Sequence, residues 1–133
     1  NDGMGDYVAT QVIKSMLKKG IQVLNSKILI LGFTFKENCP DVRNTKVIDI
    51  YHSLEEYNVN ITVFDPWAEP SIVEREYGIS VTNELPNENF DSIVLAVAHD
   101  KFKDIDICSW AKDKSVIFDV KSILPKELVD GRL

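Results

Sequence analysis

Glycine is scarce in this chain of 133 residues, which contains six. The apolar run 28–31 is followed by Gly32, and the next glycine along the chain is Gly78. The dinucleotide fingerprint G-x-G-x-x-G and the phosphate-binding P-loop each need several glycines within one strand-to-helix turn, so this loop contains neither motif. The chain is therefore expected to hold no complete dinucleotide site of its own.

Cysteine and histidine are also scarce, with two of each. Cys39 and Cys108 form no C-x-x-C pair and suggest no disulfide framework, so a reducing cytoplasm is the expected compartment. Cys108 has apolar neighbours and is expected in the core. His52 and His99 lie far apart in the sequence and have no nearby cysteine partners, so we expect no metal site.

The chain lacks both a basic surplus and a long apolar run. Its net charge of −6 argues against a nucleic-acid partner. No apolar run approaches the roughly 20 residues that cross a bilayer, so we expect no membrane partner. A hydrophobic content of 44% is ordinary for one soluble globular domain. Because the chain begins at Asn1 without a methionine, we expect it to be a fragment of a longer protein.

Apolar periodicity predicts an alternation of helices and strands. Helices are expected over residues 4–19, 45–57, 69–77, 104–112 and 125–129, and strands over 27–33, 60–64, 79–81, 91–98 and 115–120. The clearest strands are continuously apolar, which indicates that both faces of the sheet are covered. The pattern predicts an α/β fold, a Rossmann-like three-layer domain with a mainly parallel sheet, preceded by a connecting helix.

The loop after the first predicted strand contains two long cations. Lys36 and Arg43 lie seven residues apart, just before the next predicted helix, whose N-terminus favours anions. Open α/β sheets bind ligands at such loops, and this one suits phosphates or carboxylates. On position alone, a solvated lysine remains the alternative for Lys36. A surface salt bridge with Asp41 or Asp49 remains the alternative for Arg43.

The same loop carries a family resemblance. Its residues G-F-T-F-K-E-N-C-P-D-V-R-N-T, from Gly32 to Thr45, resemble the motif that opens the C-terminal domain of the UDP-glucose/GDP-mannose dehydrogenase family. Four more segments are similar to family segments and extend the resemblance over essentially the whole chain: 1–9, 63–67, 95–102 and 118–121. The run A-V-A-H-D-x-F, which contains His99, is closer to members acting on UDP-N-acetylhexosamines, the N-acetylgalactosamine and N-acetylglucosamine sugars, than to the UDP-glucose branch.

The resemblance implies a nucleotide-sugar-binding domain of an NAD-dependent UDP-sugar 6-dehydrogenase. Members oxidise the C6 hydroxyl of a nucleotide sugar to the uronic acid with two NAD, in polysaccharide precursor synthesis. Residues 1–20 would be the C-terminal part of the interdomain and dimerisation helix, and residues 21–133 the UDP-sugar-binding domain. The expected partners are a UDP-sugar, the rest of the chain and a second copy in a homodimer. The apolar stripe of the first helix is expected to lack part of its packing partner.

The resemblance also assigns roles to individual residues. Phe35 and Lys36 match family positions that contact the nucleotide sugar near its reacting end. Lys121 matches a position that is often basic and binds the sugar nucleotide from the neighbouring subunit. Arg43 matches an arginine that reaches the NAD held by the N-terminal domain. Cys39 occupies a variable position, and the catalytic cysteine belongs to a glycine-rich segment absent here, so we expect no catalytic residue and no activity in this fragment.

Three other residues at predicted strand ends have competing interpretations. Asp65 ends a strand where a Rossmann domain places its ribose-binding acid, but the missing glycines give that role little support. Trp67 could stack on a base, although packing over the sheet edge is favoured. His99 could act as a general base, but no partner carboxylate or serine is evident, which favours a structural role.

A second function class stays open from the residues alone. The chain could be a free-standing α/β ligand-binding or regulatory module. An upstream G-x-G-x-x-G unit and a glycine-flanked cysteine in the same gene would favour the dehydrogenase.

Overall fold

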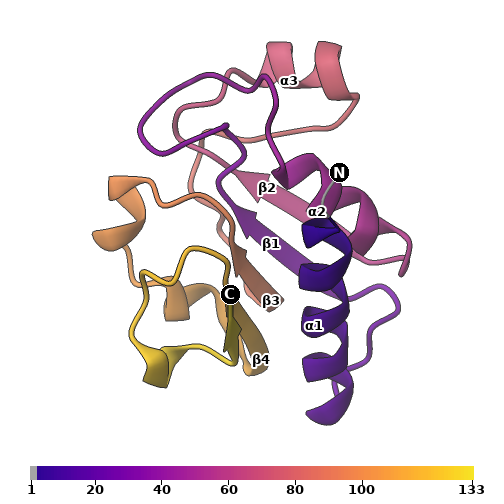
Figure 1. Ribbon diagram of the computed structural model, residues 1–133. Helices are drawn as coiled ribbons and strands as arrows, with labels where there is room; N and C mark the ends of the chain where they lie inside the picture. The colour runs from indigo at the N-terminus through magenta and orange to yellow at the C-terminus, as the bar shows by residue number, and fades with distance from the viewer. Residues whose placement is uncertain (1–2) are drawn as a thin grey trace.

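The computed structural model describes residues 3–133 and contains a five-stranded parallel sheet in the order β2-β1-β3-β4-β5 (Figure 1). The helices are α1 (Met4–Lys18), α2 (Val47–Glu55) and α3 (Pro70–Tyr77). The strands are β1 (Lys27–Leu31), β2 (Asn60–Phe64), β3 (Phe90–Leu95), β4 (Ala111–Asp119) and β5 (Gly131–Arg132). The predicted Rossmann-like α/β fold with a parallel sheet is confirmed. Asn1 and Asp2, which open the segment similar to the family's central helix, lie outside the described residues.

Some predicted elements take a different form. The strand expected over 79–81 is reduced to one bridge between Phe64 and Thr82. Within the helix expected over 104–112, the structure has one 3₁₀ turn, Ile107–Trp110, after which β4 begins at Ala111. Another 3₁₀ turn, Asp100–Lys103, precedes this range. The carboxylate of Asp106 accepts the N–H of Cys108, a local bond that competes with the helical hydrogen-bond pattern. The helix expected over 125–129 is a 3₁₀ turn, Lys126–Leu128, and the short strand β5 follows it.

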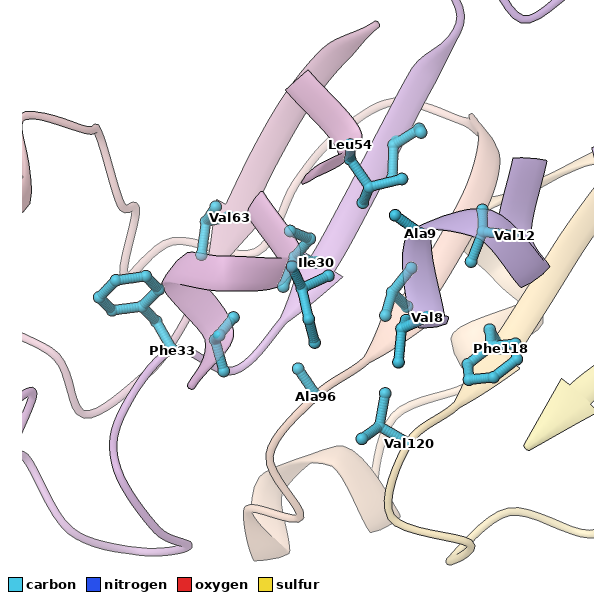
Figure 2. Packing of buried hydrophobic residues seen from close by; sticks show 14 of the residues in the cluster. Val8, Ala9, Val12, Ile30, Phe33, Leu54, Val63, Ala96, Phe118 and Val120 are labelled. Carbon is cyan, nitrogen blue, oxygen red and sulfur yellow. The ribbon is translucent and has the colours of Figure 1, made fainter. Parts of the chain in front are cut away.

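The sheet is covered differently on its two faces. Helices α1 and α2 pack on one face, where Val8, Ile30 and Phe118 are buried together (Figure 2). On the other face, the segment of 3₁₀ turns buries Phe102 and Trp110 against Phe64. The ring centroids of Phe64 and Phe102 lie 6.0 Å apart. Burial on both faces explains why the strands read as continuous apolar runs.

Helix α1 packs on its own domain. The side chains of Val8, Val12 and Met16 have no exposed surface, and the helix contacts α2 and β4 (Figures 1 and 2). The expectation that the stripe lacks part of its partner is therefore wrong for these positions. Tyr7 and Leu17 remain exposed, at 51% and 62% of their surface. The assignment of residues 1–20 to a dimerisation helix stays a prediction.

Gly5 marks the closest approach between α1 and α2. A Cβ atom at this position would lie 2.7 Å from the backbone carbonyl carbon of Asp49, which is closer than atoms can pack. Alanine normally stabilises a helix relative to glycine by about 1 kcal/mol. Here we expect the Gly5→Ala change to lower the free energy of unfolding by about 1–3 kcal/mol instead, because it overpacks the contact between the helices.

Urea unfolding monitored by circular dichroism measures this effect. Lys14→Ala on the exposed side of the same helix is the control, and it should change stability by less than about 0.5 kcal/mol. A gain in stability from Gly5→Ala would show that α1 does not press against α2.

The order of the strands creates a switch point between β1 and β3. The chain passes from β1 to β2 on one side, and then returns to β3 on the other side of β1. The loops that follow β1 and β3 therefore diverge and leave a crevice at the carboxyl end of the sheet, where open α/β sheets bind ligands. Gly32, with a φ of +95°, lets the loop after β1 leave the sheet closely against Val97.

Candidate functional site

A small pocket lies at this switch point. Its volume is about 160 Å³. It is lined by residues of the loops after β1, β3 and β4 and of the starts of α1 and α2: Met4, Thr34, Phe35, Thr45, Lys46, Val47, Ile50, Ala96, Val97, Val120 and Lys121. The structure thus brings together Phe35 and Lys121, which lie far apart in the sequence. Lys36 directly follows Phe35 and is exposed beside the pocket lining.

Lys46 is a pocket residue that the sequence analysis did not select. It immediately precedes α2 and lines the same pocket as Phe35 and Lys121. Its place at the start of a helix, behind a strand-to-helix loop, was the signal that could have identified it. Lys46 and Lys121 together give this pocket two cationic side chains, which suits an anionic ligand.

The turn that carries Lys121 is held by a buried carboxylate. Asp119 ends β4 and has no exposed surface. Its Oδ1 accepts the N–H of Lys121 at 2.9 Å, and its Oδ2 accepts the N–H of Leu124 at 2.7 Å. The backbone of Lys121 is therefore fixed while its side chain remains exposed at the pocket.

Arg43 lies outside this pocket. It lines a separate groove of about 490 Å³ with Arg75 and Tyr77. Its Nε and Nη2 donate to the two carboxylate oxygens of Asp41 at 3.0 and 3.1 Å. These hydrogen bonds from Arg43 hold the pKa of Asp41 below its usual value. The salt bridge to Asp41, one form of the alternative interpretation of Arg43, is present, and it orients an otherwise exposed guanidinium group.

Asp65 is the most highly connected side chain at the carboxyl edge of the sheet. One oxygen, Oδ2, accepts the N–H groups of Phe33 and Thr34 at 2.6 and 3.1 Å. The other, Oδ1, accepts the N–H groups of Trp67 and Ala68 at 2.7 and 3.0 Å. The side chain has no exposed surface, so it is not free to bind a ribose. Asp65 instead ties the loop after β1 to the loop after β2.

Burial alone would raise the pKa of Asp65. Hydrogen bonds from His99 and from the backbone N–H groups outweigh that effect and hold the pKa below its usual value. The buried carboxylate is therefore the ionised form, stabilised by the donors that surround it.

His99 is the fifth partner of that carboxylate. Its Nε2 lies 3.0 Å from Oδ2 of Asp65 and 3.2 Å from Oγ1 of Thr34. Its Nδ1 accepts the backbone N–H of Asn38 at 2.9 Å, so the proton of a neutral ring must sit on Nε2. The ring is fully buried. The carboxylate partner that the sequence did not reveal is Asp65, and the arrangement agrees with a structural role.

The remaining candidates contribute less to this edge. Trp67 is 45% exposed beside Pro66 and Lys101, which agrees only in part with packing over the sheet edge. Cys39 is partly buried, and Cys108 is exposed, so the expectation of a core position for Cys108 is wrong. Within residues 3–133, no group of three or more His, Cys, Asp or Glu side chains could hold a metal ion. None of the described helices is long and apolar enough to cross a membrane.

Comparison with known proteins supplies the family context. The UDP binding domain of the UDP-glucose/GDP-mannose dehydrogenase family matches residues 29–126. The chain is 50% identical to UDP-N-acetyl-D-glucosamine 6-dehydrogenase of Salmonella typhi and 46% identical to the enzyme of that name from Pseudomonas aeruginosa. Each alignment covers 100% of this chain and 32% of the relative. The chain thus spans about a third of the length of these relatives.

A solved structure has a similar fold at lower identity. The NDP-N-acetyl-D-galactosaminuronic acid dehydrogenase of Methanosarcina mazei aligns with a TM-score of 0.82 and 22% identity. The alignment covers 94% of this chain and 26% of that chain. It therefore supports the fold of this domain.

Proposed function

The chain belongs to the UDP-glucose/GDP-mannose dehydrogenase family as its UDP-binding domain, and we propose that it is the nucleotide-sugar-binding part of an NAD-dependent UDP-N-acetylhexosamine 6-dehydrogenase. The full-length protein oxidises the C6 hydroxyl of the sugar to the carboxylate of a uronic acid, a precursor for polysaccharides. The observation that carries this proposal is the 50% identity to a UDP-N-acetyl-D-glucosamine 6-dehydrogenase over the whole chain.

We propose that Phe35, Lys36 and Lys121 bind the UDP-sugar. Phe35 and Lys121 line one pocket of the same chain, which favours a ligand shared within one subunit over a contact from the neighbouring subunit. Lys36 lies beside this pocket, where its ammonium group can donate charge-assisted hydrogen bonds to the sugar end and to the carboxylate as it forms. Lys121 attracts the negative charge of the nucleotide.

The residues of this chain fit a contact to NAD but not a complete NAD site. Gly32 is the only glycine of the loop after β1, and the carboxylate of Asp65 is occupied by backbone N–H groups. We propose that the rest of the full-length protein holds NAD, which accepts the hydride, and that Arg43 reaches toward it. The planar guanidinium group suits a pyrophosphate or carboxamide, and Asp41 orients it.

The proposal extends to the assembly and its location. We propose a homodimeric enzyme in the cytoplasm, whose partners are the UDP-sugar and the rest of its own chain. The family relationship supports the UDP-sugar as a partner. The exposed Tyr7 and Leu17 of α1 are candidates for contacts to those partners.

The function is tested by comparing the 133-residue chain with the full-length protein. Each is mixed with NAD and UDP-N-acetylglucosamine, UDP-N-acetylgalactosamine or UDP-glucose, and NADH is followed by absorbance. We expect NADH only from the full-length protein, and faster with an N-acetylhexosamine than with glucose. Steady NADH production by the purified chain, in proportion to its concentration, would contradict the proposal. A full-length protein that oxidises only UDP-glucose would contradict the assigned substrate.

Removal of the Arg43 side chain should affect the cofactor. In the full-length enzyme, Arg43→Ala is expected to raise the KM for NAD by about tenfold to a hundredfold, because one charge-assisted hydrogen bond is lost. Arg75→Ala in the same groove is the control and should leave that KM unchanged. If Arg43→Ala lowered the melting temperature but left NAD kinetics intact, the arginine would be a structural ion-pair residue.

A further inference from the structure

The loop that presents Phe35 and Lys36 has no regular secondary structure, so other bonds must define its shape. At its start, the N–H groups of Phe33 and Thr34 are held by Asp65. Within the loop, Phe35 donates its N–H to the carbonyl of Asp41 at 2.8 Å. These bonds define the two ends of the loop, and they leave its tip around residue 38 to be held by something else.

The tip of the loop is held by the segment that follows β3. The backbone N–H of Asn38 donates to Nδ1 of His99 at 2.9 Å. In return, the backbone N–H of Asp100 donates to Oδ1 of Asn38 at 3.0 Å. Asn38 has a φ of +57°, a conformation that asparagine tolerates better than most residues. Two hydrogen bonds therefore clamp this one residue across the switch point.

His99 joins this clamp to the buried carboxylate. One ring nitrogen accepts from the loop tip, and the other faces Asp65, which holds the loop start. Both nitrogens are thus engaged with protein groups, and the ring has no exposed surface. A histidine in this arrangement cannot abstract a proton from a substrate, but it can set the distance between the tip of the loop and its start.

We infer that His99 is a positioning residue, which fixes the loop from Phe33 to Asp41 so that Phe35 and Lys36 meet the UDP-sugar. The inference rests on the proposed function of that loop. It gives the buried His99 a part in substrate binding through its hydrogen bond to the loop tip, without any contact to the substrate. Asn38 is the residue through which His99 acts.

Two substitutions, His99→Asn and His99→Gln, distinguish a positioning role of His99 from a purely structural role. The Oδ1 atom of asparagine can take the place of the histidine Nδ1, so His99→Asn keeps an acceptor for the N–H of Asn38. The amide nitrogen of glutamine takes the place of Nε2, so His99→Gln keeps a donor to Asp65 but loses that acceptor. Both replacements shrink the buried side chain and should lower the melting temperature.

Substrate kinetics of the full-length enzyme provide the main readout. We expect His99→Gln to raise the KM for the UDP-sugar about fivefold to tenfold, the effect of one lost hydrogen bond. His99→Asn should stay within about twofold of wild type. Equal KM values for the two variants, whether raised or unchanged, would overturn the inference.

A variant outside the core keeps the test valid if the His99 variants fail to fold. Asn38→Gly keeps the backbone N–H and the positive φ but removes the acceptor for Asp100. Because it removes one of the two hydrogen bonds of the clamp, it should raise the KM for the UDP-sugar at least about threefold. An unchanged KM would show that the clamp at residue 38 does not position the loop, which would overturn the inference. In the 133-residue chain, amide hydrogen exchange at Asn38 should be slow in wild type and in His99→Asn, and fast in His99→Gln. Fast exchange in wild type would show that the clamp is absent.

A double variant distinguishes this inference from the proposed function. In the Lys36→Ala background, His99→Gln should have little further effect on the KM, because both changes act through the same loop. If Lys36→Ala itself left substrate kinetics unchanged, the function proposed for the loop would fail. If Lys36→Ala acted and His99→Gln added its full effect independently, only the positioning role would fail.

Discussion

Replacing Asp65 by alanine is expected to lower the free energy of unfolding by about 3 kcal/mol or more. The substitution removes the acceptor of four backbone N–H groups and of the His99 ring, all at a fully buried position. A buried donor left without an acceptor costs about 1–3 kcal/mol, although water can enter and satisfy some of them. The loss is a large share of the roughly 5–15 kcal/mol that stabilises a domain. Urea denaturation followed by circular dichroism measures it.

The contribution of Asp65 to the free energy of unfolding should depend on pH in a defined direction. The pKa of Asp65 is lowered in the folded state, so its contribution to stability is present above the unfolded value of about 3.9. It is lost as the pH falls through the lower, folded value. The difference in stability between wild type and Asp65→Ala should therefore shrink in acid. Asp104→Ala on the exposed surface is the control. A difference that stayed constant down to low pH would mean that Asp65 is not ionised.

Lys36→Ala in the full-length enzyme is expected to reduce kcat/KM for the UDP-sugar by about a hundredfold. Lys36 is proposed to meet the sugar end, where negative charge forms as the alcohol becomes a carboxylate. Part of its interaction then exists only along the reaction, so kcat should fall as well as the affinity for substrate. Steady-state kinetics with a UDP-N-acetylhexosamine separate the two constants.

The control for this variant is Lys101→Ala. Lys101 is also exposed near the carboxyl edge of the sheet, but it borders a different hollow, beside Trp67. It should leave both constants unchanged, and both variants should keep the melting temperature of wild type. A rise in the KM for NAD, or an unchanged kcat, after Lys36→Ala would contradict a contact at the reacting end of the sugar.

Local sequence patterns predict the elements best where one signal dominates. The strand over 60–64 was predicted with the bounds that the structure has, because the Asp65-Pro66 pair ends it sharply. The helix ending at Tyr77 was also identified, since Gly78 follows it with a positive φ. The strand β5 has two residues and forms by pairing with β4. Two residues are too few to show an alternating apolar pattern, so the local sequence does not indicate this strand.

The carboxyl edge of the sheet shows why the site was only partly predictable. Phe35, Lys36 and Lys121 were selected through the family resemblance, but the common pocket of Phe35 and Lys121 depends on strand order. The Asp65–His99 pair spans 34 residues and forms because β2 and β3 flank β1. Long-range pairs of this kind are absent from any sequence window, so the sequence alone reveals no partner for His99.

The buried carboxylates at the ends of β2 and β4 affect the entropy of ligand binding. Asp65 and Asp119 have already ordered the backbone on either side of the pocket by accepting its N–H groups. Ordering a free loop on binding would cost roughly 1–2 kcal/mol for each residue fixed, and that cost would weaken affinity. In this domain, the backbone around the pocket is already ordered in the folded state, so this entropy is lost on folding and not on ligand binding. A ligand that enters the pocket therefore loses little affinity to backbone ordering, and mainly the exposed cationic side chains remain to be immobilised.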